Sequence, residues 1–341
     1  MAFVPAFVGL DYHSETIRVC VMTQDADVLV NRNVRNCPAA VIDLVRSQNV
    51  FVQGVAIEAC CGAADFAARL AEATEWDVRM AHPAYVQKLK QGRDKTDCGD
   101  AALLADLLRV NYLPEVWLAD ETTRQLRRLV RYRQGLVEER KAVKLRLRSL
   151  LREERVECET SRAWTKAWFA WLDTIRLGEQ SRWVLDQDRR RLARLDEAIA
   201  EVDVRMETAT ADDPVVQKLR QQAGVGLVTA LVLRAAVGRF DRFRNGKQLA
   251  KYCGLTPCNA SSGKRQADAG LIDEGNPELR AVLIQLAKRL PRHVDRWREL
   301  HVRLRRTKPA NVASAAIANR WVRQLHHLMV ERRDPSDSQA A

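Results

Sequence analysis

The sequence predicts an α/β domain with a mixed sheet at its N-terminal end, followed by a helical region over the rest of the chain. Short apolar and β-branched runs separated by polar turns fill the first hundred residues, which is typical of strands. Apolar residues at three- and four-residue spacing dominate the middle, which is typical of long helices. The charge divides in the same way, because residues 1–100 hold 10 Lys or Arg against 13 Asp or Glu, while the whole chain has a net charge of +12.

Composition and charge restrict the class of function. An acidic front joined to a basic remainder suggests a cation-binding centre attached to a body that binds a polyanion such as nucleic acid. The N-terminus lacks a signal-sequence pattern and no apolar run approaches the length of a membrane span, so we expect a cytoplasmic protein without membrane contact. The 8 cysteines are scattered without a Cys-x-x-Cys pair, which predicts free thiols.

The order of the elements in the first domain indicates its fold. Three strands are predicted, then a helix, a strand, a helix and a strand, and the helix that begins at Asp97 comes last. This is the order of the ribonuclease-H-like (RuvC-like) fold, and we expect residues 1–115 to adopt it. The predicted strands cover residues 7–11, 17–23, 27–34, 50–58 and 76–81, and the helices between them cover 38–47 and 62–73.

Four carboxylates stand at the ends of these elements. Asp11 closes the first strand, Glu58 closes the fourth, and Asp97 and Asp100 share one helix face because they are three residues apart. Converging carboxylates repel one another unless a cation lies between them, and their hard oxygens suit Mg²⁺ or Mn²⁺. Two such ions can stabilise both the attacking and the leaving oxygen of a phosphodiester. The simpler alternative makes Asp97 an N-cap, Asp100 an acidic first-turn residue, and the other two solvated strand ends.

Residues 116–212 are predicted to form a basic helical coiled coil. Residues 124–155 contain 12 basic and 4 acidic residues above an apolar stripe, and a second helix repeats apolar residues at coiled-coil spacing from Leu185 to Met206. We expect a helical hairpin, or pairing with another subunit into a homo-oligomer. The basic face is expected to bind nucleic-acid phosphates, with a solvated arginine-rich face as the alternative. The candidate contacts are Arg124, Arg127, Arg128, Arg131, Lys141, Lys144 and Arg148.

Three tryptophans lie between the two helices. Trp164, Trp168 and Trp171 are spaced by four and three residues, so we expect them on one face of a helix. We favour helix packing over base stacking as their role.

Residues 213–330 are predicted to form a small, mainly helical domain, and residues 331–341 a disordered tail. The run Gly224-Val225-Gly226 before an Ala-rich helix resembles a helix–hairpin–helix. That motif presents the backbone N–H groups of a helix N-terminus to a phosphate. Gly224 and Gly226 are therefore candidate nucleic-acid contacts.

A serine loop follows in the same region. Ser261 and Ser262 stand beside Lys264 and Arg265, and the next helix contains Arg280. These cations could stabilise the charge that develops when a serine attacks phosphorus. A loop of this composition is more often simply flexible.

Two sets of these residues resemble the DEDD-type insertion-sequence transposases of the insertion sequence one-ten group, which also contains the Piv invertase. The first set is Asp11, Glu58 and the run Lys95-Thr96-Asp97 with Asp100 and Ala101. The second set is Gly224-Val225-Gly226, Leu255-Thr256-Pro257 with Ser262-Gly263-Lys264, and Gly275-Asn276 with Leu279 and Arg280. Together the two sets follow the family's order over nearly the whole chain.

The resemblance implies a ribonuclease-H-like domain, a coiled coil and a serine-bearing domain. It implies DNA recombination through a covalent phosphoserine, with Mg²⁺ at the four carboxylates. It also implies guidance by a structured RNA that the element encodes and that pairs with donor and target DNA. The coiled-coil spacing adds the expectation of a dimer or tetramer.

The resemblance favours Ser262 over Ser261 as the nucleophile, because the family's serine directly precedes a glycine. Gly263 also leaves room for a bulky phosphodiester. One departure from the family is that Asp273 and Glu274, with Asp268 upstream, stand where basic residues are usual. This departure predicts weaker phosphate contacts in that loop.

Two other functions are consistent with the residues. A metal-dependent nuclease of the resolvase type would use the carboxylates and water, without a covalent intermediate. A nucleic-acid-binding scaffold would use the basic helices and no chemistry.

Overall fold

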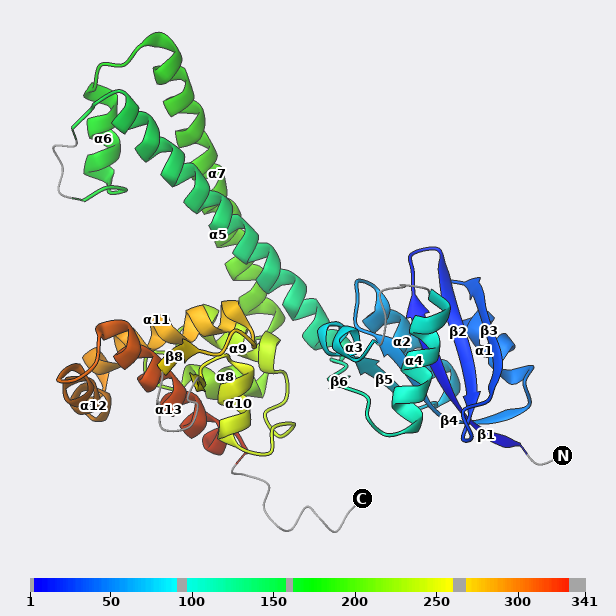
Figure 1. Ribbon diagram of the computed structural model, residues 1–341. Coiled ribbons are helices and arrows are strands. Elements are labelled where there is room, and N and C mark those ends of the chain that lie inside the picture. The colour runs from blue at the N-terminus through cyan, green and yellow to red at the C-terminus, as the bar shows by residue number, and fades with distance from the viewer. Residues whose placement is uncertain (1–2, 91–96, 158–161, 260–267, 331–341) are drawn as a thin grey trace. The chain divides into compact units, whose positions relative to one another are not determined.

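The structure, a computed structural model, describes residues 3–90, 97–157, 162–259 and 268–330. The chain divides into two compact units, Met1–Asp120 and Glu121–Ala341 (Figure 1). In its described residues the first unit is a mixed sheet flanked by helices, and the second is helical apart from a short β-hairpin. No helix within the described ranges is both long and apolar enough to cross a membrane.

The described part of the first unit is built on a six-stranded sheet with the order β3-β2-β1-β4-β5-β6. The first three strands form an antiparallel meander, β4 and β5 run parallel to β1, and β6 is antiparallel to β5. The strands are β1 (Val4–Tyr12), β2 (Thr16–Thr23), β3 (Val28–Arg35), β4 (Val50–Glu58), β5 (Val78–Ala81) and β6 (Glu115–Val116).

Helices cover both faces of this sheet because its strands alternate two sets of buried side chains. One face carries Val8, Leu10 and Ile57, which pack under α1 (Pro38–Arg46) and α2 (Ala63–Thr74). The other face carries smaller residues and packs against α3 (Pro83–Leu89) and α4 (Asp97–Arg109). The sheet is therefore a central layer between two helical layers.

The expected succession of strands and helices up to residue 81 is found in the structure. β6 was not expected, because two residues are too few to show a periodic pattern. It pairs with β5, and the first unit continues to Asp120. The expected boundary after residue 115 falls inside this strand.

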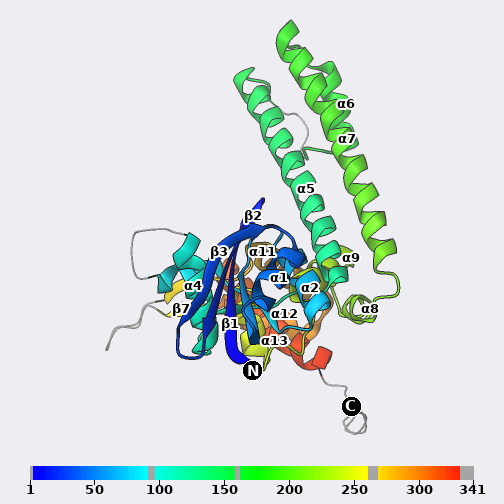
Figure 2. The same ribbon diagram turned by 90° about the vertical axis from the view of Figure 1, so that its right-hand side faces the viewer.

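A helical hairpin begins the second unit. It consists of α5 (Glu121–Glu153) and α7 (Glu179–Ala209), with α6 (Lys166–Thr174) between them in the chain (Figure 2). Apolar residues that recur along both helices, such as Leu147 and Leu192, are buried between them. Ion pairs join the two helices, with Arg133 Nε 2.5 Å from Asp203 Oδ1 and Arg146 Nη2 2.6 Å from Asp188 Oδ1. The hairpin thus forms within one chain, as one of the two expected arrangements.

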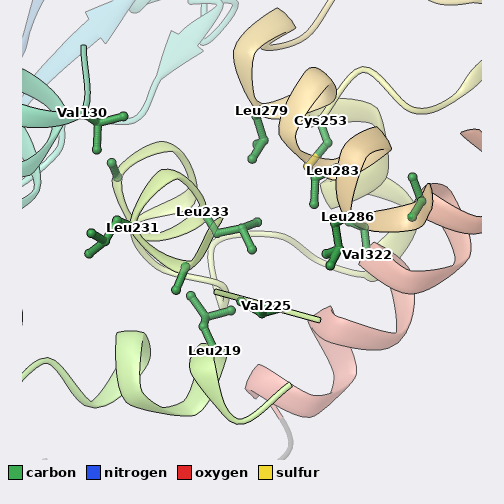
Figure 3. Close-up of a cluster of buried hydrophobic side chains, with 14 of the residues drawn as sticks. Val130, Leu219, Val225, Leu231, Leu233, Cys253, Leu279, Leu283, Leu286 and Val322 are labelled. Carbon is green, nitrogen blue, oxygen red and sulfur yellow. The ribbon is translucent and has the colours of Figure 1, made fainter. Parts of the chain in front are cut away.

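The remaining helices pack around one apolar core together with the base of α5. Figure 3 shows this core, in which Val130 of α5 and Leu231 of α9 lie on one side and Leu283 of α11 and Val322 of α13 on the other. The elements are α8 (Pro214–Arg220), α9 (Leu227–Val237), α10 (Gly246–Tyr252), β7 (Pro257–Asn259), β8 (Asp268–Leu271), α11 (Pro277–His293), α12 (Asp295–Arg305) and α13 (Ala310–Val330).

Polar side chains tie the hairpin to this helical core. Asp213 caps α8 by accepting hydrogen bonds from the backbone N–H groups of Val215 and Val216. Its other carboxylate oxygen lies 2.7 Å from Nε of Arg234 on α9, and Arg234 also donates to Thr123 on α5 at 3.0 Å. Buried apolar contacts run without a break from α5 to α13. The division between residues 116–212 and 213–330 therefore stays a prediction from sequence.

Candidate active site

Asp11 and Glu58 lie at the C-terminal ends of two neighbouring parallel strands. The register of β1 and β4 pairs Leu10 with Ile57, so the two carboxylate residues follow side by side. Leu10 and Ile57 are buried in the core under α1 and α2. Because successive residues of a strand point to opposite faces, Asp11 and Glu58 point to the face that α4 covers.

Gly9 lets α4 lie directly on that face of β1. A Cβ atom at Gly9 would lie 2.6 Å from the backbone nitrogen of Ala105 and would overlap the carbonyl oxygen of Ala101. Farther along the helix, Leu108 Cδ2 would lie 3.3 Å from a Cβ atom at Gly54 of β4. Gly54 precedes Glu58 on its strand, so α4 runs antiparallel to β1 and β4.

This direction brings the N-terminal end of α4 to the end of the sheet that carries Asp11 and Glu58. Asp100 directly precedes Ala101, and its side chain is mostly buried, with 13% exposed. Asp97 begins the helix, but its side chain lies outside the described residues. The structure therefore brings three of the four predicted carboxylates to one end of one face.

Basic side chains contact two of these carboxylates. Nε2 of His13 lies 3.1 Å from Oδ2 of Asp11, and Nζ of Lys90, just after α3, lies 2.7 Å from Oδ1 of Asp100. A carboxylate cluster attracts cations, which explains the contact of Lys90. Lys90 could not be singled out from the sequence, because it belongs to no motif.

The thiol of Cys60 lies close to the same negative charges. Burial raises the pKa of Cys60 above its ordinary value, and the nearby charges of Glu58 and Asp11 raise it further. A hydrogen bond to the backbone of Ala63 acts in the opposite direction. Both strand-end carboxylates therefore lie near enough to Cys60 to raise the pKa of its thiol.

A closed metal cage is not found among the described side chains. Within them, no three Asp, Glu, His or Cys side chains come close enough together to hold a metal ion. Asp97 is not among those side chains. The described carboxylates of Asp11, Glu58 and Asp100 therefore do not form a closed metal site. Asp97, whose side chain is not described, is the fourth predicted ligand.

The predicted nucleophile lies outside the described residues, as do Ser261, Lys264 and Arg265. The segment that contains Ser262 connects β7 to β8, and these strands pair with Pro257 opposite Leu271. The structure therefore describes the two strands on either side of the serine segment, and places both in the second unit.

Arg280 holds the chain that follows β8. Its Nη2 atom donates to the carbonyl oxygen of Ile272 at 2.8 Å and to that of Glu274 at 3.1 Å. Gly254 permits this arrangement, because a Cβ atom there would lie 2.6 Å from Nε of Arg280. Gly275 has a φ of 106°, and a Cβ atom on it would lie 2.6 Å from the nitrogen of Gly254. Arg280 is thus bound to the backbone of the chain that follows β8.

The candidate cations of α5 fall into two groups. Arg124 pairs with Glu121, and Arg127 donates from Nε to the carbonyl oxygen of Ala235 at 2.7 Å at the end of α9. Arg128 lies 3.7 Å from Glu121 and is largely exposed. Arg131, Lys141, Lys144 and Arg148 make no ion pair with a described residue and remain the stronger candidates for phosphate contacts.

The two candidate glycines before α9 also differ. Gly224 has a φ of 77°, and a Cβ atom on it would meet Leu286 Cδ1 at 3.2 Å, so it faces the core. Gly226 is the N-cap of α9, and a Cβ atom there would meet nothing within 4 Å among the described residues. Only Gly226 has the open space that a phosphate would need.

Sequence reasoning did not single out Gly9. Its signal is a glycine inside an apolar strand, two residues before Asp11, where close approach of another backbone is a usual reason. The prediction for Trp164 was wrong, because α6 begins at Lys166 and Trp164 precedes it with a φ of 70°. Trp168 is buried and Trp171 partly buried in the core, as expected.

Two family models match the chain. One is described as a transposase, of the DEDD type named after IS110, and matches residues 8–155. The other is described as the transposase IS116/IS110/IS902 family and matches residues 216–302. The first match covers most of the sheet unit together with α5, and the second covers most of the segment from α8 to α12.

Similar proteins span both units. A probable family 20 transposase of Pseudomonas aeruginosa is 27% identical over 336 residues, which are 94% of this chain and 96% of that protein. The transposase for insertion sequence element IS1111A of Coxiella burnetii is 26% identical over 293 residues, 84% of this chain and 78% of that protein. The transposase for insertion sequence element IS1328 of Yersinia enterocolitica is 26% identical over 274 residues, 79% of this chain and 81% of that protein.

Proposed function

The chain belongs to the IS110 type of DEDD transposases, and from this premise we propose how it recombines DNA. The first unit would be a ribonuclease-H-like domain whose carboxylates act on a phosphodiester, and Ser262 would carry the DNA as a covalent phosphoserine. The packing of α4 over Gly9 is the observation that carries this proposal. It gathers Asp11, Glu58 and Asp100 at one end of one sheet face.

The family implies a divalent metal, and the donor chemistry fits one. Asp11, Glu58, Asp97 and Asp100 supply hard carboxylate oxygens, which Mg²⁺ prefers and Mn²⁺ accepts. The contact of the Lys90 ammonium with Asp100 supports a site that attracts cations. A bound ion would supply stabilisation of negative charge on the phosphate oxygens.

The serine step conserves phosphoester bonds. Oγ of Ser262 would attack phosphorus and lose its proton, while the bond to one DNA oxygen breaks and that oxygen takes up a proton. A hydroxyl of a second strand would then attack the phosphoserine and release the serine. Each step exchanges one phosphoester for another, so no nucleotide cofactor is required. Arg280 fixes the backbone that follows β8 through its hydrogen bonds to the carbonyl oxygens of Ile272 and Glu274.

The second unit would bind nucleic acid and a second subunit. The cations of α5 without a described ion pair support contact with the phosphates of DNA or of a guide RNA. Trp183, Val184 and Val204 are large apolar residues exposed on α7, and they support a dimer or tetramer formed through the hairpin. Guidance by an RNA that the element encodes rests on the family resemblance.

A recombination assay separates this proposal from its alternatives. Protein purified with its co-purifying RNA is given donor and target DNA, and Asp11→Asn, Ser262→Ala and Asp106→Asn are compared with the unmodified chain. Asp106 is the control, because it lies on α4 but pairs with Arg109. The first two variants should lose the joined product and the control should keep it. Cutting that survives Ser262→Ala would favour a hydrolytic nuclease, and full function of Asp11→Asn would favour a scaffold.

A further inference from the structure

A cleft on the hairpin lies outside the carboxylate centre and the serine segment. It forms where Trp164, which precedes α6, lies against one side of α5, and it has a volume of about 200 Å³. Its lining combines basic and apolar side chains in one small space. All of the residues that line it belong to α5, apart from Trp164 itself.

Three of the four basic residues that line the cleft follow one stripe of α5. Lys141, Lys144 and Arg148 are spaced by three and four residues, so they rise along the same helix face. One turn of helix advances about 5.4 Å, which sets the cations at regular steps along the cleft. A chain of phosphates could contact them in succession.

These cations differ from the other basic residues of the hairpin. Arg133 and Arg146 pair with acidic residues of α7 and hold the two helices together. Arg140 also lines the cleft, but it pairs with Asp196 of α7. Lys141 and Arg148 have no such partner among the described residues, although they belong to the same helix. Lys141 and Arg148 therefore take no part in the described ion pairs between α5 and α7.

Apolar groups form the rest of the cleft. Leu145 also lines the cleft and is 57% exposed. Nζ of Lys144 lies 5.0 Å from the ring centroid of Trp164, and Trp168 supports that ring, with the two centroids 4.5 Å apart. Trp164 has a φ of 70°, a left-handed conformation that bulky residues avoid. The backbone thus holds an aromatic ring beside a row of cations.

We propose that this cleft binds an unpaired nucleotide of a single-stranded nucleic acid, a role that rests on the proposed function because it requires the chain to work on nucleic acid. The base would lie against Trp164 and Leu145, and the flanking phosphates would contact Lys141 and Arg148. Aromatic stacking platforms beside cations are the usual means by which proteins bind single strands.

Other polyanions fit this cleft less well. Duplex DNA presents phosphates to the cations, but its stacked and paired bases cannot enter the apolar part. An acidic peptide would satisfy the cations but would make no use of the apolar part of the cleft at Trp164 and Leu145. The combination of ring, exposed leucine and cation row therefore favours a base with its own phosphates.

Photocrosslinking locates the base directly. Oligonucleotides that carry a single 5-iodouracil, one set of RNA and one of single-stranded DNA, are irradiated with the full chain and mapped by mass spectrometry. The proposal expects a crosslinked peptide that contains Trp164, and the set that gives it identifies the source of the strand. Crosslinks confined to other peptides in both sets would overturn the proposal, whether or not the protein recombines DNA.

Matched variants measure the contribution of the cleft. Trp164→Leu should weaken binding of the crosslinking strand at least about fivefold, with little change for duplex DNA. Tyr132→Leu is the control, because Tyr132 is an exposed aromatic residue of α5 that does not line the cleft. Leu145→Ser tests the same prediction at an exposed position where folding is not at risk.

The salt dependence of binding separates the contribution of the phosphate contacts from that of the base contact. Arg148→Ala should lower the salt slope of binding by roughly 0.7 for each phosphate that the arginine neutralises, and Arg190→Ala on α7 should not. Replacing the 5-iodouracil nucleotide by an abasic one should remove the effect of Trp164→Leu. An unchanged effect on the abasic strand, or equal losses for duplex and single strand, would overturn the proposal.

Discussion

Nζ of Lys90 lies 2.7 Å from Oδ1 of Asp100, and both side chains are largely shielded from solvent. A lysine in this position balances the charge of a carboxylate that three other acidic residues are predicted to join. It also competes with any other cation that approaches the same oxygen. The contact therefore links the stability of the unloaded site to its affinity for metal.

Lys90→Gln should raise the affinity of the chain for Mg²⁺ several-fold, because it removes a cation that competes for Asp100. Lys88→Gln removes the same charge two residues earlier, where the ammonium lies over the ring of Tyr85 instead of a carboxylate. Calorimetric titration with Mg²⁺ measures both variants. Equal changes in the two would mean that only the overall charge matters.

Gly9→Ala should destabilise the first unit by about 1–3 kcal/mol or more, because the new Cβ atom would overlap the backbone of α4 at Ala101. The control is Gly135→Ala on α5, where a Cβ atom meets nothing within 4 Å among the described residues. That change should stabilise the helix by about 0.5–1 kcal/mol. Urea denaturation of both variants gives the two signs, and a neutral Gly9→Ala would argue against the close packing of α4.

Arg127→Gln should lower the free energy of unfolding by about 1.5–3 kcal/mol and leave the salt slope of DNA binding unchanged, because Arg127 is bound to backbone carbonyls of α9. Arg131→Gln should do the reverse, with a slope lower by roughly 1 and little loss of stability. Binding at several salt concentrations, together with urea denaturation, measures both quantities. A lower slope for Arg127→Gln would return this residue to the phosphate contacts.

Arg280→Lys should loosen the chain after β8, because a flexible lysine lacks the rigid planar guanidinium that aims one nitrogen at both carbonyl oxygens. Limited proteolysis should then cut faster between residues 257 and 275, while DNA affinity changes little. Arg289→Lys serves as the control on the exposed side of the same helix. Loss of DNA affinity at an unchanged cutting rate would assign Arg280 to phosphate binding instead.

The strands of the first unit could be predicted because each has its own periodic signal, and Asp11 and Glu58 mark the ends of two of them. The side chains of Asp11 and Glu58 point toward α4 because Leu10 pairs with Ile57 across the two strands. No local sequence pattern predicts that pairing. The position of α4 depends on Gly9, whose lack of a side chain is a weak signal in sequence.

The cations show the limit of charge patterns. Arg127 and Arg131 have the same residue type and lie one turn apart on α5, yet the first donates to a carbonyl 108 residues away. Sequence alone contains no sign of that partner. For the same reason the hydrogen bonds from Arg280 to the carbonyl oxygens of Ile272 and Glu274 could not be predicted from the sequence, and its contact with phosphate stays a prediction.

Cys253 ends α10 and is fully buried in the core of Figure 3. Burial raises the pKa of its thiol to about 12, and the charge of Arg242 acts in the opposite direction. In the unfolded chain the thiol ionises near its ordinary value of 9.0. The unfolded state therefore loses this proton at a lower pH than the folded state does, and folding becomes less favourable in between.

Stability from this thiol is fully present below pH 9 and is lost as the pH rises toward 12, by about 1.4 kcal/mol per pH unit. Cys253→Ala should lower stability at pH 8, because it leaves a small cavity. Between pH 8 and pH 10.5 it should then lose about 2 kcal/mol less than the unmodified chain, since it has no thiol to ionise on unfolding. Urea denaturation in reductant measures the difference, with the exposed Cys61→Ala as the control. Parallel pH curves for the unmodified chain and Cys253→Ala would show that the buried thiol does not control stability in this range.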